Sequence, residues 1–475
     1  LTTGWLFEKT DDDSLCDRFM DSLSGTESSE LDADLESAVK GTGLHGRKAS
    51  QLRLDAKAAI EKLRDRWLEV FNYLETEKSS AKKDSPYAKR LEVEQKRHMG
   101  EYLLRDLAAR TFLPGYGFPT DVVNFDNFTI EDYIRTQKQK EQKKDREDNI
   151  SRYKNLPSRN LAIAIREYAP GAEIVLDGRV FRSAGVSLHW HNLAADSNEA
   201  QKFDLAWRCK HCGELGYEEG VTDTHSLVCT NDECGAAIDE DSTKKVLVPA
   251  GFVTDAYEST TNNVEHQKYI PVQQPWVIVK KAPEVALPDP ALGFMRSGPD
   301  GMVFHHSDGE LGKGFAVCMQ CGRAHSMVGQ DEFPQELNTA RSHQSPRPSK
   351  EDRYELNGSK HIADCGGQGA LQKNITLGAH SRTDVFELVL RQPASNEYLI
   401  DDGENGRNRA VALTLAVALR FALASKLGVS ASELGFGTRP AKIDGQSVLV
   451  IQLYDELSGG AGFASSAPEY IEDLL

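Results

Sequence analysis

The sequence predicts an α+β protein, in which a helical N-terminal segment is followed by mixed β/α lobes with two cysteine-rich modules. Residues 49–109 carry apolar side chains at three- and four-residue steps, which is the spacing of amphipathic helices. Beyond residue 170, short runs of β-branched and aromatic residues are bounded by turn residues, which favours strands. Seven of the eight cysteines lie in two groups at spacings typical of metal sites.

Length, charge and cysteine content narrow the class of protein. The 475 residues are enough for roughly two to four domains with buried cores. The net charge of −17 argues against binding of nucleic acid or membranes over the whole surface, because such proteins usually carry a basic excess. The longest apolar run, at residues 411–424, is interrupted by Arg420 and is too short to span a bilayer, so we expect no membrane partner.

Eight cysteines are few for a disulfide scaffold of this length, which indicates a reducing compartment and a cytoplasmic protein. No signal peptide or lipidation motif is visible. The first residue is Leu1 rather than Met, and Leu475 lies in an expected helix. We therefore expect a piece of a longer polypeptide.

The N-terminal third is expected to be helical after an acidic stretch. Residues 1–48 are rich in Asp, Glu, Ser and Gly and are interpreted as an acidic linker or insertion. Residues 49–130 form the predicted helical segment, with one helix marked by the apolar stripe at residues 60–74. Residues 131–155 carry mixed charges and predict a charged linker or solvated helix, with a phosphate-contacting arm as the alternative.

The rest of the chain is expected to form two lobes. Residues 156–300 predict a β-rich lobe, and residues 301–475 predict an α/β C-terminal domain. In the first lobe, Asp177 and Gly178 separate two strand-like runs and predict a hairpin with a type I′ turn. In the second, residues 408–427 form the strongest helical pattern of the chain and are followed by a glycine that can end the helix.

The first cysteine group contains four thiols in two short pairs: Cys209, Cys212, Cys229 and Cys234. A four-thiolate site needs two arches that each direct two sulfurs at one point, and a glycine after each arch permits the positive φ that this requires. Gly213 and Gly235 hold these positions. The spacing predicts a zinc ribbon with all four thiols as ligands, and disulfides or inert buried thiols are the alternatives.

The second group contains three thiols with the same arch pattern: Cys318, Cys321 and Cys365. His361 is expected to be the fourth ligand because it precedes Cys365 by four residues. His325 and His380 compete with it, since a polar loop of this length lets either fold back. We expect Zn²⁺ here too. All four positions of each zinc module can be filled by protein, so the ions are predicted to be structural and no residue is assigned a catalytic role.

No motif for nucleotide hydrolysis is visible, since the chain lacks a GxxxxGK[ST] phosphate loop and a helicase DE-box. The one suggestive loop lies at residues 453–463, where a strand leads into a glycine-rich turn before an expected helix. Its N–H groups predict anion binding at Gly459, Gly460 and Gly462, with a simple tight reversal of the chain as the alternative. Basic side chains could face nucleic-acid phosphates near such a site: Arg179, Arg182 and Arg439.

Several blocks of the sequence occur in a recognisable order. They are FLPGYGFP at residues 112–119, YAPGAE at 168–173 with Asp177-Gly178-Arg179, Arg382-Thr383-Asp384, LYDELSGGAGF at 453–463, and the cysteine tetrad. Together they resemble the C-terminal zinc-binding region of MrfA-type superfamily-2 helicases, which recurs in bacterial antiphage proteins of the Druantia and DISARM systems. The resemblance extends in scattered blocks from residue 103 to residue 475.

The resemblance implies metal binding by the cysteines and a DNA-processing protein whose helicase lobes precede this region in the same polypeptide. It implies single- or double-stranded DNA and those lobes as partners, with ATP and Mg²⁺ bound only in domains outside this chain. The sequence departs from the family pattern in two ways: it lacks helicase motifs, and it contains a second cysteine group. Which of the two cysteine groups corresponds to the family's zinc site therefore stays open.

We therefore expect a zinc-stabilised accessory C-terminal region of an ATP-dependent DNA helicase or translocase in bacterial antiphage defence, which supports the motor and contacts DNA. The alternative is a non-catalytic protein–protein scaffold that binds a partner protein of a defence complex. The acidic net charge favours this alternative.

Overall fold

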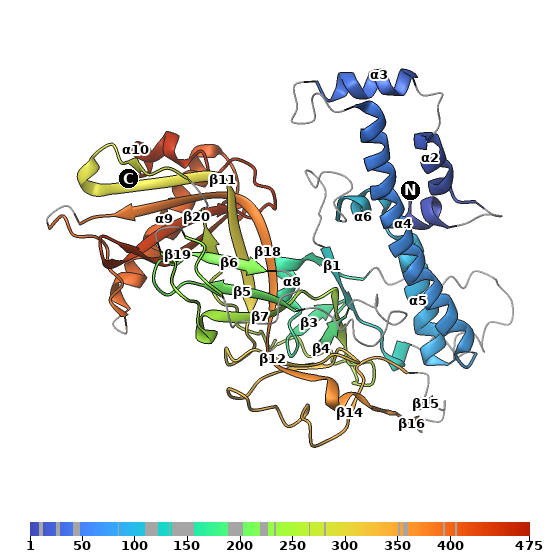
Figure 1. Cartoon of the computed structure of the whole chain (residues 1–475). Coiled ribbons are helices and arrows are strands. Elements are labelled where there is room, and N and C mark those ends of the chain that lie inside the picture. Colours follow the sequence, from blue (N-terminus) through green and yellow to red (C-terminus); the bar gives the residue numbers. More distant parts are fainter. Residues whose placement is uncertain are drawn as a thin grey trace.

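A computed structural model shows a helical arm beside a body of curved sheets (Figure 1). Helices and strands both contribute extensively, so the predicted α+β class is confirmed. The sequence block at 112–119 and most of the charged run at 131–155 lie outside the described residues. The described residues are 1–8, 13–24, 29–40, 48–83, 85–109, 122–132, 134, 156–188, 203–218, 227–231, 234–265, 267–279, 282–349, 352–354, 360–392, 395–403 and 406–475.

The helical arm is the described part of residues 1–109. Its helices are α1 (Thr3–Phe7), α2 (Leu15–Ser24), α3 (Ser29–Ala38), α4 (Ala49–Ser80), α5 (Pro86–Gly100) and α6 (Leu103–Ala109). The 32-residue α4 forms the long axis of the arm in Figure 1. Helix α5 begins where Ser85 accepts a hydrogen bond from the Ala88 N–H at 3.1 Å and Pro86 opens the first turn, which is a favourable N-terminal sequence.

An apolar core holds the arm together. Trp67 of α4 is 1 % exposed and stacks on Phe71 and His98, with ring-centroid distances of 5.2 and 4.7 Å. Phe7 of α1 and Cys16 of α2 are buried in the same cluster. The expectation of an acidic linker over residues 1–48 is therefore corrected for the described part, because its few apolar side chains lie on helix faces that reach α4.

The smaller sheet of the body has the strand order β2-β1-β8-β4-β3. Its strands are β1 (Val122–Asp126), β2 (Ser158–Asn160), β3 (Glu173–Leu176), β4 (Arg179–Ser187) and β8 (Gly251–Thr254). Strand β1 pairs in parallel with β8, so the expected helical segment 49–130 ends before this strand. Helix α8 (Leu161–Glu167) follows β2 and begins where the Asn160 side chain accepts the Ala162 N–H at 2.9 Å.

Strands β3 and β4 form the predicted hairpin. Residues 173–176 pair in antiparallel register with residues 179–182. Asp177 has a φ of 50° and Gly178 a φ of 73°, and two successive positive values are the signature of a type I′ turn.

The larger sheet contains eleven strands and connects both expected lobes. Strand β11 crosses residue 300 and pairs with β18 along its length, apart from a bulge near Gly298. The expected boundary between 156–300 and 301–475 therefore cuts through a strand, and the two lobes share one sheet. The main path runs β10 (Val285–Ala286), β11 (Gly293–Ser307), β18 (Leu371–Leu390), β7 (Thr243–Leu247), β5 (Asp204–Arg208) and β6 (Leu215–Glu218).

The remaining strands of this sheet are β9 (Trp276–Ile278), β12 (Phe315–Cys318), β13 (Ala324–Ser326), β19 (Leu434–Ile443) and β20 (Gln446–Asp455). Two short sheets lie apart from it. They pair β14 (His343–Gln344) with β17 (Asp364–Cys365), and β15 (Arg353–Tyr354) with β16 (Lys360–His361).

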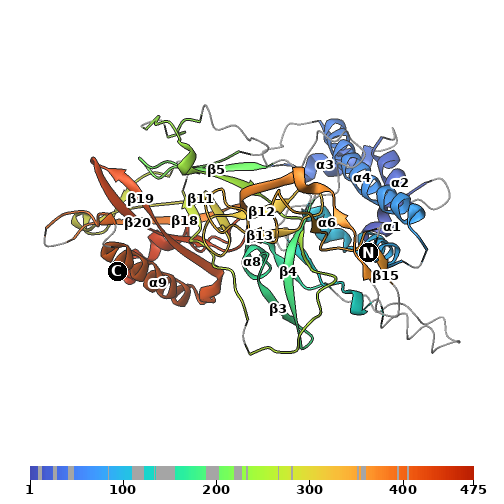
Figure 2. The ribbon, with the colours of Figure 1, turned by 90° about the horizontal axis from the view of Figure 1, so that it is seen from below.

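The predicted long helix is α9 (Arg407–Leu427), which lies along β19 and β20 (Figure 2). It ends at Gly428, whose φ of 70° is the left-handed conformation expected there. In the part of the chain that the structure describes, α9 alone is long and apolar enough to cross a bilayer, but one side of it is buried in the core of the body. The expected C-terminal helix is reduced to a 3₁₀ turn and α10 (Ile471–Leu474).

A buried ion pair connects β18 to β19. Arg439 donates from Nε and Nη2 to the two carboxylate oxygens of Glu387, at 2.7 and 2.8 Å, and the two side chains are 4 % and 2 % exposed. Gln452 of β20 donates to the same carboxylate at 2.7 Å. Burial disfavours the charge of Glu387, but Arg439 outweighs this effect and lowers the pKa of the carboxyl. Arg439 is thus inaccessible, which corrects the expectation that it faces phosphates.

Replacing Arg439 with Ala is expected to lower the free energy of unfolding by about 3–5 kcal/mol, because Glu387 is then left buried without a partner. The matched control is Arg409→Ala. Its pair with Asp401 leaves the arginine 56 % exposed, so its loss should cost at most about 1 kcal/mol. Urea unfolding followed by circular dichroism measures both variants, and equal losses would contradict the structural role of the buried pair.

Candidate metal centres and the glycine-rich loop

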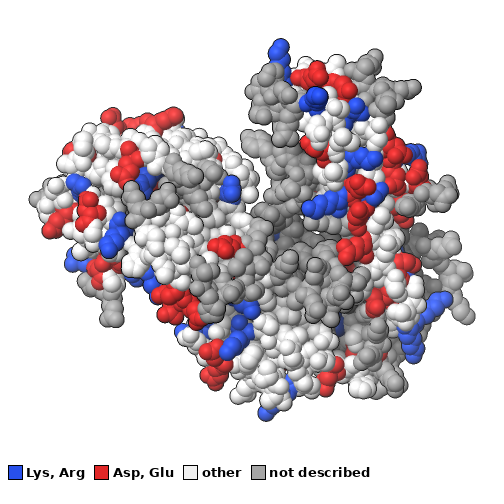
Figure 3. Space-filling view, in the orientation of Figure 1, with Lys and Arg blue, Asp and Glu red and all other residues white. Residues whose placement is uncertain are grey.

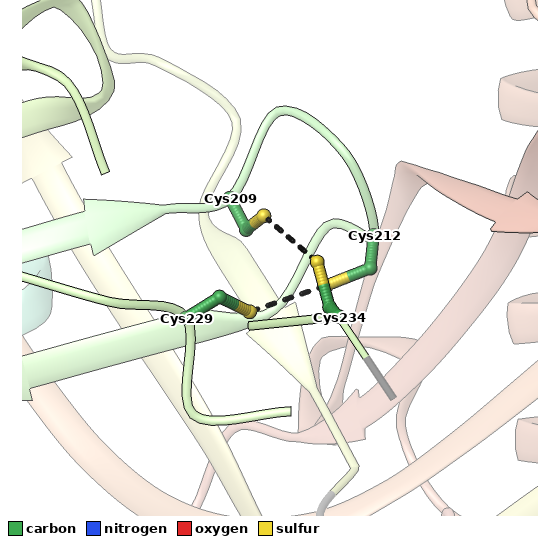
Figure 4. A group of neighbouring side chains, drawn as sticks. All are labelled: Cys209, Cys212, Cys229 and Cys234. Atoms are coloured by element: carbon green, nitrogen blue, oxygen red, sulfur yellow. Dashed lines mark hydrogen bonds between the residues drawn. The ribbon is translucent and has the colours of Figure 1, made fainter. Parts of the chain in front are cut away.

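The four thiols of the first cysteine group meet at one point (Figure 4). Their Sγ atoms all lie within 4.8 Å of one another. The sulfurs of Cys212 and Cys229 are 3.4 Å apart, and those of Cys209 and Cys234 are 3.8 Å apart. All four are free thiols, so the structure contains the converging thiols that the spacing predicted rather than disulfides.

Two backbone arches place these sulfurs. Cys209 directly follows β5, and β6 begins after the arch, so the first arch is the turn of a hairpin. Gly213 has a φ of 74° and donates its N–H to the Cys209 carbonyl at 2.9 Å. Gly235 closes the second arch with a φ of 56°. Both glycines thus adopt the left-handed conformation that the arch pattern requires.

The first arch also contacts the C-terminal part of the large sheet. Arg439 donates from Nη1 to the Cys212 carbonyl at 3.3 Å. A Cβ at Gly213 would lie 2.1 Å from the carbonyl oxygen of Pro440, so only glycine permits this approach. The thiol cluster is therefore attached to the buried pair of Arg439 and Glu387.

Burial disfavours the ionised form of two thiols of this cluster. It raises the pKa of Cys212 to about 11 and also raises the pKa of Cys229. The backbone N–H of Ala236 is the main cause that lowers the pKa of Cys234. Several thiolates this close repel one another, so a bound cation is the feature that would allow all four to ionise.

The second centre joins three thiols to one histidine: Cys318, Cys321, His343 and Cys365. Their ligand atoms also lie within 4.8 Å of one another. The Sγ of Cys321 is 3.5 Å from Nε2 of His343, and the Sγ of Cys318 is 3.9 Å from that of Cys365. Cys318 ends β12, Gly322 closes the arch with a φ of 78°, and His343 lies opposite Cys365 in the pair of β14 and β17.

His343, and not His361, completes this cluster. His361 is exposed on β16, where it pairs with β15. Of the two competing candidates, His325 lies on β13 and His380 stacks on Tyr217 at a centroid distance of 4.0 Å. His361 was expected because it is the histidine nearest to Cys365 along the chain. His343 instead reaches the cluster because β14 pairs with β17. The sequence feature that could have pointed to His343 is its position in the long polar stretch between Cys321 and Cys365.

The thiols and the imidazole of the second cluster shift one another's pKa values. Hydrogen bonding with Cys318 is the largest of the causes that raise the pKa of His343 to about 9. Cys321 and Cys365 lower the pKa of Cys318, and Cys318 in turn raises the pKa of Cys321. The thiols thus favour the protonated form of the His343 imidazole, and a metal ion bound at the same place would displace that proton.

The donor atoms of both centres suit a structural ion. One set offers four sulfurs, and the other offers three sulfurs and an imidazole nitrogen. Such sets favour Zn²⁺ in closed tetrahedral coordination. Among the described residues, neither set includes a carboxylate or leaves a coordination position that the protein does not fill. The arrangement can therefore hold together the segments that supply the ligands.

The glycine-rich loop is held by a buried carboxylate. Asp455 accepts hydrogen bonds from the backbone N–H groups of Ala461, Phe463 and Ala464 at 2.6, 3.1 and 2.7 Å. Burial raises the pKa of Asp455, although these N–H groups oppose the rise. The side chain is 1 % exposed, so it forms part of the loop structure.

The N–H groups of the three glycines are also occupied. Asp384 accepts the Gly462 N–H at 3.2 Å, and backbone carbonyls accept those of Gly459 and Gly460. An anion at this loop would meet two carboxylates and no unengaged glycine N–H. The expectation of an anion site at Gly459, Gly460 and Gly462 is corrected, since the loop is a tight reversal of the chain.

Two basic candidates remain, both on the hairpin of β3 and β4. Arg179 lies 3.5 Å from Asp132, and its side chain is 21 % exposed. Arg182 is exposed on β4 opposite Glu173. On the face drawn in Figure 3, acidic and basic side chains of the coloured residues alternate over arm and body without forming a basic stripe.

No family model matches the chain. In sequence, it is 28 % identical over 397 residues to the Druantia protein DruE of Escherichia coli (strain UMEA 4076-1). This match covers 79 % of the chain and 19 % of DruE, so the chain spans less than a quarter of the length of that relative.

Among solved structures, the DUF1998 helicase MrfA bound to DNA is similar at a TM-score of 0.28 and 10 % identity, over 67 % of this chain and 26 % of that chain. A likeness at this score carries no argument about fold or function. The sequence similarity to DruE is therefore the comparison on which functional reasoning rests.

Proposed function

We propose that both centres bind Zn²⁺ and that the ions stabilise the body. The convergence of four sulfurs in one centre, and of three sulfurs and a histidine in the other, supports this assignment. The arches place soft donors at the ends of β5 and β12, where an ion would add to the apolar packing around the thiols. Each ion would connect segments that are distant in sequence.

Metal analysis of the purified chain is expected to find two zinc ions per chain, one for each centre. His343→Ala should remove one of them, because the imidazole is one of four ligands in a site that the protein fills completely. The matched control is His361→Ala, an exposed histidine of the same polar stretch, which should retain both ions. Inductively coupled plasma mass spectrometry measures the zinc content.

Full retention of zinc in the His343 variant, or loss of zinc from the His361 variant, would contradict the ligand set. Removing both ions with a chelator should lower the thermal midpoint of the body, since metal binding in such sites is coupled to folding.

The function best supported is that of a zinc-stabilised accessory region of an ATP-dependent DNA helicase or translocase in bacterial antiphage defence. The observation that carries this proposal is the sequence similarity over 397 residues to the Druantia protein DruE. The ordered sequence blocks and the two closed donor sets agree with a structural role beside a motor. ATP and Mg²⁺ would be bound by lobes outside this chain, and DNA would be the shared partner.

Specific observations also favour a second function, that of a protein scaffold in a defence complex. Arg439 is buried in an ion pair, and the glycine-rich loop is occupied by carboxylates. The net charge is −17. These features remove most of the phosphate contacts expected from the sequence and leave Arg182 as the exposed candidate.

DNA binding separates the two functions. In the complete defence protein, binding at low salt is expected to weaken steeply as salt is raised, because phosphate contacts release counterions. Arg182→Ala should reduce the slope of log affinity against log salt by about 1 if that arginine contacts a phosphate. Arg409→Ala, an exposed arginine on α9, serves as the control. Fluorescence anisotropy with labelled single- and double-stranded DNA measures both variants.

Absence of DNA affinity at low salt, with a stable partner protein co-purifying, would reject the DNA-contacting function and favour the scaffold. Plaque counts in cells that carry the complete defence system test the antiphage role. Protection should fall when Cys212 or Cys321 is replaced by Ser, with protein levels measured in parallel, and unchanged protection would contradict the proposal.

A further inference from the structure

Arg347 lies where the helical arm meets the body. Its side chain is largely buried, at 10 % exposure. Nη1 is 3.9 Å from the carboxylate of Glu94 on α5, and Nε is 3.8 Å from that of Asp126 on β1. Nη2 donates to the hydroxyl of Ser187 on β4. One buried cation therefore faces one carboxylate of the arm and one of the body.

The segment that carries Arg347 begins at the second centre, because His343 precedes Arg347 by only four residues. Four residues span at most about 14 Å when fully extended, so the position of one end limits that of the other. Between them, the Gln344 carbonyl accepts the Nε–H of Arg323 at 2.5 Å. The Pro346 carbonyl accepts the N–H of Ala256 at 2.8 Å. The segment is thus held against the body along its length.

The start of this segment depends on the cluster. His343 belongs to β14, a strand of two residues whose partner β17 is equally short. Isolated pairs of this length are not stable by themselves in water. A ligand bond from the imidazole to an ion shared with Cys318, Cys321 and Cys365 would therefore add to the Arg323–Gln344 bond in fixing β14 in place.

The arm has its own apolar core. The two apolar clusters of the arm, around Trp67 and around Leu74, contain arm residues only. Helices α2, α3 and α5 pack mainly on α4. Among the described residues, arm and body share no apolar cluster, so polar contacts at the junction contribute to the orientation of the arm.

We propose that the ion of the second centre acts as a latch for the arm. With the ion bound, His343 keeps residues 343–347 in place. Arg347 then holds Glu94 of the arm beside Asp126 of the body. When the ion leaves, β14 loses one of the contacts that hold this segment, Arg347 is positioned less firmly, and the arm gains freedom to change its orientation. This inference rests on the proposed zinc binding at the second centre.

Small-angle X-ray scattering of the complete chain tests the latch, with zinc content measured on the same samples. Arg347→Ala is expected to retain both ions and to increase the radius of gyration and the maximum dimension. Glu94→Gln removes the negative charge that faces Arg347 and leaves residues 343–347 unaltered. It should change both quantities in the same direction. His343→Ala should lose one ion and show the same expansion. The matched control Arg341→Ala removes an exposed arginine two residues before His343 and should change neither.

The outcomes separate the latch from the metal centre. Unchanged scattering of both Arg347→Ala and Glu94→Gln would overturn the latch and leave the zinc assignment intact. Retention of both ions by His343→Ala would overturn the second centre itself. Expansion of His343→Ala alone would show that the ion orients the arm without Arg347. Circular dichroism confirms that each variant is folded, and Glu94→Gln carries the test if Arg347→Ala does not fold.

Discussion

The convergence of sulfur and nitrogen side chains from separate segments at two points is the constraint that most closely defines how the body is held together. In the first centre, the arch after β5 meets a second arch and contacts β19 through Arg439. In the second, the end of β12 meets β14 and β17. The arch after β5 and the arch after β12 each extend a strand of the large sheet. The two centres therefore attach polar loops to the same sheet. Coordination can supply there the cohesion that apolar packing supplies elsewhere.

Buried charges play structural roles that their sequence context does not reveal. Arg439 neutralises Glu387 inside the large sheet, and Asp455 organises the glycine-rich loop by accepting backbone N–H groups. A basic residue near a glycine-rich turn suggests phosphate binding when read along the chain. In the folded protein both features face inward, because a buried charge requires a partner and these partners are protein groups. Both charged groups therefore stabilise the fold.

Local physics explains the features of the fold that were predicted correctly. The turn at Asp177 and Gly178, the arches closed by Gly213 and Gly322, and the end of α9 at Gly428 all depend on positive φ values that glycine and aspartate tolerate. The pairing of distant strands is not encoded in such short windows. For that reason the lobes were expected to divide at residue 300, whereas β11 crosses that point in a sheet that both lobes share.

The sequence by itself determined the seven clustered thiols, their grouping and their arches, because ligand type and glycine spacing are local properties. Only the tertiary structure decided that His343 rather than His361 joins the second group, since the pairing of β14 with β17 brings it opposite Cys365. Tertiary structure also decided that Arg439 is buried and that the acidic N-terminal residues build helices of the arm. The physical reason is the same in each case: burial and contact depend on neighbours that are far away along the chain.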